Sequence, residues 1–181
     1  MKIIYVLLDG VGDIPTPSLN FLTPLEAART KTLDNLARLG SLGMVTPVRG
    51  GFPPESDVAV FGMLGYDFGV DYVGRGVIES VGQGVEFNNG DVALRINFAT
   101  VDSNLNVIDR RAGRNLTTNE SNELTNTIRE ELILNDQKAT FTLESTEDHR
   151  GVLVLRVEDS DLSSDVTNTD PAVGKMGGFG I

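Results

Sequence analysis

The pattern of apolar and polar residues in the first third of the chain predicts the beginning of a doubly wound α/β sheet. Residues 2–8 form an almost unbroken apolar run, as expected for a parallel strand buried on both faces. Residues 23–26 read Thr-Pro-Leu-Glu, a capping box with proline at the first helical position, which predicts a helix start. Apolar residues at helical spacing predict a second helix that ends at Gly40. We also expect a short strand at 42–48 and a helix from Ser56 to about Leu64.

A glycine-dense segment, residues 65–84, separates this region from one with a different pattern. Glycines at this density are typical of turns and hinges, so we place a domain boundary here. The remaining predicted elements are, in order, strands at 91–100 and 106–108, a helix opened by a capping box at 117–120, and a hairpin of strands at 140–143 and 151–157. The predicted division is the N-terminal part of an α/β core at 1–75, a smaller α+β domain at 76–165, and a segment at 166–181 that returns to the core.

Composition narrows the classes of partner. The chain has 181 residues, no cysteine and a formal net charge of −11, which argues against disulfides, thiolate metal sites and nucleic acid binding. No apolar run is long enough to cross a bilayer, so no membrane partner is expected. The N-terminal run lacks a small-residue cleavage site, and we therefore predict a cytoplasmic protein.

Two residues near predicted strand and helix ends could act in phosphoryl transfer. Asp9 follows the first apolar run, at the sheet edge where α/β proteins gather ligands. Ser56 follows two prolines and opens a predicted helix, whose N-terminus favours an anion such as phosphate. A metal-binding carboxylate and a serine nucleophile are one interpretation; a plain N-cap serine and a structural aspartate are the alternative. Because His149 is the only histidine, further metal ligands would have to come from elsewhere.

Asp109-Arg110-Arg111-Ala112-Gly113-Arg114 places three arginines within five residues of a chain with few basic residues. The planar guanidinium group binds carboxylates and phosphates with two parallel hydrogen bonds, so a small bis-anionic ligand is expected here. Surface ion pairing with the many acidic residues is the alternative. His149 and Arg150, in a predicted turn, could join the same site. Residues 165–171, which end in Asp-Pro, are predicted to form a loop.

Six segments in order resemble the archaeal-type cofactor-independent phosphoglycerate mutases of the alkaline phosphatase superfamily. They are VLLDGVGD, TPLEAARTKTLDNLARLG, PPESDVAVFGMLGYD, NFATVD, DRRAGR and VTNTDP. The resemblance covers essentially the whole chain but only the N-terminal portion of the family, whose members are about twice as long. It implies an α/β fold: an alkaline-phosphatase-like parallel-sheet core, incomplete here, with an inserted α+β domain.

The resemblance also implies roles for individual residues. Asp9 and Ser56 match metal ligands of the family, and Ser56 matches the serine that is transiently phosphorylated. The site would hold two divalent metal ions, with Mn2+ as the first choice and Mg2+, Co2+ or Zn2+ as alternatives. The reaction would interconvert 3- and 2-phosphoglycerate. The groups expected to hold the substrate are Arg111 and Arg114, then Asp109, Arg110, His149 and Arg150.

The family's remaining metal ligands lie in its C-terminal half, so we expect this chain to carry an incomplete site and to be inactive by itself. The partner implied is that C-terminal half. Two alternatives remain open on the sequence alone. One is another phosphatase or phosphomutase of the superfamily, which would share Asp9 and Ser56. The other is a non-catalytic module that binds anions through the arginines and needs neither metal nor Ser56.

Overall fold

The computed structural model describes residues 2–48, 55–135 and 138–170, and these fall into two units, Met1–Thr46 and Pro47–Ile181. The first unit contains a 3-10 helix, η1 (Pro17–Leu19), and two α-helices, α1 (Pro24–Ala27) and α2 (Lys31–Leu39). The capping box that predicts α1 is formed, because Thr23 and Glu26 each bind the backbone N–H of the other. The second helix ends at Gly40, as predicted.

The parallel sheet predicted for the N-terminal region is not found among the described residues. Residues 2–8 are extended but form no strand, and their apolar side chains are exposed, Ile3 by 80% and Ile4 by 87%. The short strand predicted at 42–48 is absent as well. A strand needs a neighbour to pair with its N–H and C=O groups, and the described part of this unit contains no strand. Asp9 therefore follows an extended segment here, rather than a strand of a sheet.

The second unit begins with three helices, α3 (Ser56–Met63), α4 (Phe68–Asp71) and α5 (Arg75–Gln83). The helix predicted to start at Ser56 is confirmed. Helix α5 was not predicted, because glycines at this density are typical of hinges. Gly76 is instead required by packing: a Cβ atom there would lie 2.0 Å from the carbonyl oxygen of Ala93, so only glycine lets α5 approach the neighbouring strand this closely.

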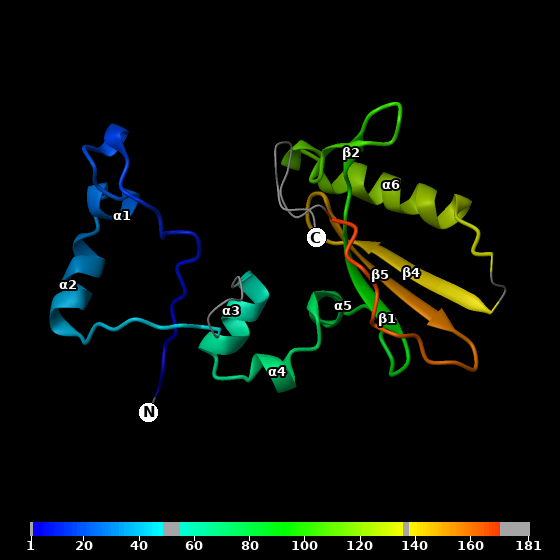
Figure 1. The fold of residues 1–181 in the computed structure, drawn as a ribbon, viewed down its shortest axis with the longest axis horizontal. Helices are drawn as coiled ribbons and strands as arrows, with labels where there is room; N and C mark the ends of the chain where they lie inside the picture. Colours follow the sequence, from blue (N-terminus) through cyan, green and yellow to red (C-terminus); the bar gives the residue numbers. More distant parts are fainter. Residues whose placement is uncertain (1, 49–54, 136–137, 171–181) are drawn as a thin grey trace. The chain divides into compact units, whose positions relative to one another are not determined.

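A three-stranded antiparallel sheet forms the centre of this unit (Figure 1). Its order is β1–β5–β4, with bounds β1 (Val92–Asn97), β4 (Ala139–Ser145) and β5 (Arg150–Val157). The predicted hairpin is thus confirmed. A second, two-stranded sheet pairs β2 (Thr100–Val101) with β3 (Val107–Asp109), followed by a short 3-10 helix, η2 (Ala112–Arg114), and by α6 (Thr118–Glu131).

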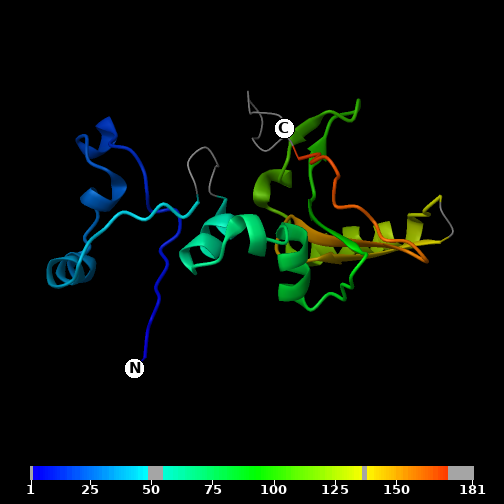
Figure 2. The ribbon, with the colours of Figure 1, turned by 60° about the horizontal axis from the view of Figure 1, so that its bottom comes forward.

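Helices cover both faces of the larger sheet (Figure 2). In its register Ser145 aligns with Gly151, and Val152 aligns with Arg95, so Ser145 and Arg95 point to opposite faces. Helix α6 reaches the Ser145 face through a hydrogen bond from Ser145 to Asn122, and α5 reaches the other face through Glu79 and Arg95. The core between these layers includes Leu143, Val152 and Val154, each no more than 3% exposed.

The described helices include none that is both long and apolar enough to cross a bilayer. The predicted domain limits at residues 75 and 165 remain predictions, since the division into two compact units concerns a different boundary.

Candidate active site

Ser56 is the first residue of α3 and is exposed to solvent. Its hydroxyl makes no hydrogen bond to any described residue, and the N-cap position belongs to Glu55. The interpretation of Ser56 as a capping serine is therefore wrong. A free hydroxyl beside the unpaired N–H groups of a helix start is able to meet an anionic ligand.

The residues on either side of Ser56 are held by the segment that follows. Asp57 accepts a hydrogen bond of 2.5 Å from the Tyr72 hydroxyl, and its other oxygen lies 3.8 Å from the Arg75 guanidinium. Glu55 accepts a hydrogen bond of 3.4 Å from Arg75. Burial, and after it the hydrogen bond to Asp57, raises the pKa of Tyr72 well above its ordinary value, so the phenol stays protonated.

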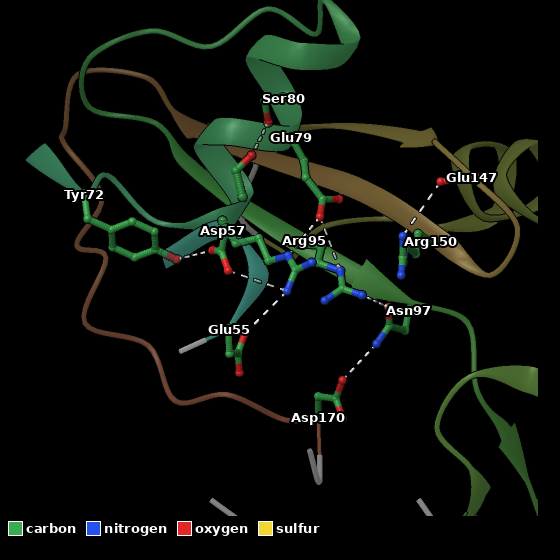
Figure 3. A network of polar contacts seen from close by, with 12 residues as sticks. Glu55, Asp57, Tyr72, Glu79, Ser80, Arg95, Asn97, Glu147, Arg150 and Asp170 are labelled. Atoms are coloured by element: carbon green, nitrogen blue, oxygen red, sulfur yellow. Dashed lines mark hydrogen bonds and ion pairs between the residues drawn. The ribbon is translucent and has the colours of Figure 1, made fainter. Parts of the chain in front are cut away.

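A polar network that includes Glu79, Arg95 and Asn97 lies across the sheet face (Figure 3). Glu79 accepts from Arg75 at 3.1 Å and lies 3.6 Å from Arg95. Arg95 donates to Asn97 at 3.0 Å.

The same network ends at the predicted arginine segment. Asn97 donates to Asp170 at 2.8 Å, and Asp170 also accepts from Arg110 at 2.7 Å. The predicted loop before residue 171 therefore contributes Asp170 as the link between the sheet and Arg110. A continuous series of ion pairs and hydrogen bonds thus joins the flanks of Ser56 to the arginine segment.

The arginine segment itself forms a strained turn. Ala112, Gly113 and Arg114 have φ values of 46°, 70° and 55°, which for the two non-glycine residues is costly. Asp109 stabilises the turn by accepting a hydrogen bond of 2.9 Å from the Arg111 backbone N–H. The side chain of Arg111 has a buried Nε without a hydrogen-bond partner among the described residues, while Arg114 is exposed. Neither side chain is hydrogen-bonded to Ser56 in the described part of the chain.

His149 is 3% exposed, and neither of its ring nitrogens has a hydrogen-bond partner among the described residues. Burial lowers the pKa of His149, and the neighbouring positive charges of Arg150, Arg95 and Arg114 lower it further. Asp148 opposes these effects only weakly, as the last contributor. The imidazole is therefore held neutral in cationic surroundings, which suits a ligand that brings negative charge.

Arg95 is one of the positively charged side chains near His149, but sequence reasoning did not identify it. Its side chain is 16% exposed, and its Nε is buried without a hydrogen bond, although Glu79 lies within ion-pair distance. Burial, followed by the positive charge of Arg75, lowers its pKa. The available signal was a single guanidinium inside the apolar run 92–96, since a charged side chain that is largely buried rarely lacks a partner.

The two side chains predicted to bind metal, Asp9 and Ser56, belong to different units, so their role as metal ligands remains a prediction. Two side chains would in any case need further ligands, because a divalent cation takes four to six or more. Within the described ranges, no group of three or more carboxylate or imidazole side chains is arranged to hold a metal ion.

Comparison with known proteins gives one consistent result. Residues 37–179 match the family model described as 2,3-bisphosphoglycerate-independent phosphoglycerate mutase. Curated relatives with that description include one from Aeropyrum pernix, 43% identical over all of this chain and 42% of the relative. Another, from Methanopyrus kandleri, is 46% identical over 96% of this chain and 41% of the relative. The chain therefore spans about two fifths of the length of these relatives.

A solved structure is also similar in sequence. It is described as the cofactor-independent phosphoglycerate mutase from Thermoplasma acidophilum, and it is 38% identical to this chain with a TM-score of 0.48. The similarity covers 93% of this chain and 42% of that structure. The prediction that the resemblance extends over only part of the family's length is thus confirmed.

Proposed function

Because this chain belongs to the family of 2,3-bisphosphoglycerate-independent phosphoglycerate mutases, we propose that it supplies the nucleophile and the anion-binding groups of such an enzyme. The reaction is the interconversion of 3-phosphoglycerate and 2-phosphoglycerate. The observation that carries the proposal is the polar network that joins the flanks of Ser56 to the segment containing Arg110.

In this proposal Ser56 carries the phosphoryl group between two positions of the substrate. Its Oγ attacks the phosphorus atom and loses its proton, while the bond from phosphorus to the 3-oxygen of glycerate breaks and that oxygen takes up a proton. Glycerate reorients, its 2-hydroxyl loses a proton and attacks the phosphorus atom of phosphoserine, and the bond from phosphorus to the serine Oγ breaks, so that Ser56 regains its proton. The exposed, unbonded hydroxyl at the start of α3 supports this role, because the helix N-terminus favours the negative charge that accumulates there.

The arginine segment would hold the rest of the substrate. Phosphoglycerate carries a carboxylate and a phosphate, and both match the guanidinium fork. We assign Arg111 and Arg114 to these groups, with Arg110 and Asp109 shaping the turn and His149 and Arg150 beside them. Buried nitrogens of Arg111, Arg150 and His149 that lack partners among the described residues support a ligand at this place.

We further propose that the site becomes complete only with protein beyond this chain. Asp9 and Ser56 would be two of the ligands of a two-metal site, with Mn2+ the first candidate. The remaining ligands, and strands to pair with residues 2–8, would come from the rest of the enzyme. The exposed apolar side chains of residues 3–8 support this part of the proposal.

The test is conversion of 3-phosphoglycerate to 2-phosphoglycerate with Mn2+ and without bisphosphoglycerate. It compares the 181-residue chain, the whole enzyme of which it forms part, and Ser56→Ala in that enzyme. We expect conversion by the whole enzyme only, and its loss in the variant. Conversion by the 181-residue chain would overturn the incomplete site, and conversion by the Ser56→Ala enzyme would overturn the nucleophile.

The same assay separates the alternatives. Release of inorganic phosphate without 2-phosphoglycerate would indicate a phosphatase. Binding of 3-phosphoglycerate that survives both chelation of metal and Ser56→Ala, with no turnover, would indicate a binding module.

A further inference from the structure

The two residues next to Ser56 present an electrostatic problem for phosphoryl transfer. Glu55 and Asp57 are both carboxylates, and each is adjacent in sequence to Ser56. A phosphate group that approaches the Ser56 hydroxyl carries the same sign of charge, so two free carboxylates would repel it. Something must neutralise them and turn them away from the nucleophile.

Arg75 contacts both carboxylates with one guanidinium group. Its terminal nitrogen lies 3.4 Å from Glu55 and 3.8 Å from Asp57, while its Nε is 3.1 Å from Glu79, one turn along α5. Glu79 thereby fixes the direction of the guanidinium group. Tyr72 holds the second oxygen of Asp57, whose side chain is only 9% exposed.

We propose that Arg75 is a positioning residue for Ser56: it draws the flanking carboxylates together and cancels their charge, so that an anionic substrate can reach the hydroxyl. The proposal rests on the proposed function, because it assumes that Ser56 accepts a phosphoryl group. It assigns Arg75 no contact with the substrate or with the reacting atoms.

Two features distinguish this arrangement from an incidental surface ion pair. One guanidinium bridges residues on both sides of the nucleophile, so it constrains the backbone through Ser56 and not a single side chain. The pair with Asp57 is also shielded, since the side chains of Arg75 and Asp57 are 28% and 9% exposed, so solvent screens it less than the pair with Glu55, whose side chain is 65% exposed. Lysine would replace it only in part, because an ammonium group has no second nitrogen to bind Glu79 while the first contacts Glu55 and Asp57.

The experiment measures kcat and KM of the whole enzyme for 3-phosphoglycerate, with Arg75→Ala, Arg75→Lys and, as the matched control, Arg129→Ala. Arg129 on α6 also pairs with a carboxylate, Glu144, but lies outside the network. We expect kcat/KM to fall at least about tenfold in Arg75→Ala, less in Arg75→Lys, and to remain within about twofold in the control.

A charge-removal series separates positioning from a merely structural role. If Arg75 acts by neutralising its partners, Glu55→Gln and Asp57→Asn in the Arg75→Ala background should recover most of the lost kcat/KM. Equal activity of Arg75→Ala and wild type would overturn the proposal, and so would a loss that the two amide substitutions leave unchanged. If Arg75→Ala does not fold, Arg75→Lys with and without the amide substitutions decides the question in the same way.

Failure of the proposed function has a different signature. The enzyme is incubated with 3-phosphoglycerate, and the peptide that contains Ser56 is examined by mass spectrometry. Phosphoserine in that peptide reports phosphoryl transfer whether or not 2-phosphoglycerate forms. Absence of phosphoserine in the wild-type enzyme would overturn the function itself. A wild-type signal that is unchanged in Arg75→Ala would overturn only the role of Arg75.

Discussion

The two units of this chain use similar local signals with different results. The Met1–Thr46 unit has a complete capping box and an apolar run, yet none of its described residues is buried. Ile4 is 87% exposed and Leu39 is 79% exposed, whereas Val152 and Leu143 in the sheet are 0% and 3% exposed. Capping forms a helix from neighbouring residues, but burial of an apolar side chain requires partners from elsewhere. The difference shows that local signals suffice for the helices of the N-terminal unit but not for burial of its apolar side chains.

The largest difference in stability is expected when a leucine is replaced by alanine in each of the two units. Leu143→Ala should lower the free energy of unfolding by about 2–5 kcal/mol, because it leaves a cavity in the core of the sheet unit. Leu39→Ala removes an exposed side chain and should change it by no more than about 0.5 kcal/mol. Urea unfolding followed by circular dichroism measures both. Equal losses would show that the N-terminal unit is packed in solution.

A second comparison uses two glycines of α5. Gly76→Ala places a methyl group against the Ala93 backbone and should destabilise the sheet unit by about 1–3 kcal/mol. A methyl group at Gly82 would meet no atom within 4 Å, so Gly82→Ala should stabilise the helix by about 0.5–1 kcal/mol. Thermal unfolding of the two variants gives the signs. Destabilisation by both would contradict the assigned packing of α5.

The two capping boxes offer a smaller contrast. Thr117→Ala removes the cap of α6, which packs on the sheet, and should cost about 1 kcal/mol. Thr23→Ala removes the same cap from α1, which has four residues and buries none, so global unfolding should hardly change. Urea unfolding measures this difference in unfolding free energy as a shift of the midpoint, provided that the dependence of the free energy on urea concentration is unchanged. A larger effect at Thr23 would mean that α1 has tertiary contacts.

The smallest expected effect concerns His149, the only histidine, whose NMR signals would report on the proposed anion site. Its pKa is lowered in the folded chain, so the unfolded chain binds the proton more tightly. Its contribution to stability is therefore present above about pH 6.5 and is lost as pH falls towards the folded pKa. Inorganic phosphate should raise the His149 pKa by offsetting the guanidinium charges. An unchanged titration with phosphate would remove the support for an anion beside His149.

The predictions from sequence succeeded where the signal and the structure are close together along the chain. Both capping boxes, the helix at Ser56 and the hairpin of β4 and β5 are fixed by residues a few positions apart. They failed where distant segments meet. Residues 2–8 predict a strand that has no partner in the described unit. The glycine-dense segment before β1 predicted a hinge but contains helix α5, because Gly76 is needed for the close approach of α5 to Ala93.

The sequence by itself determined most of the local elements and the acidic balance of charge, and it supplied the residues on which the proposed function rests, Ser56 and the arginine turn. Only the tertiary structure decided that Arg75 bridges the two neighbours of Ser56. It also brought Arg95 into the polar network and placed Asp170 between Asn97 and Arg110. The reason is the range of the interactions. Capping and periodicity act within one or two turns, whereas an ion pair between residues 60 positions apart exists only after the sheet has brought them together.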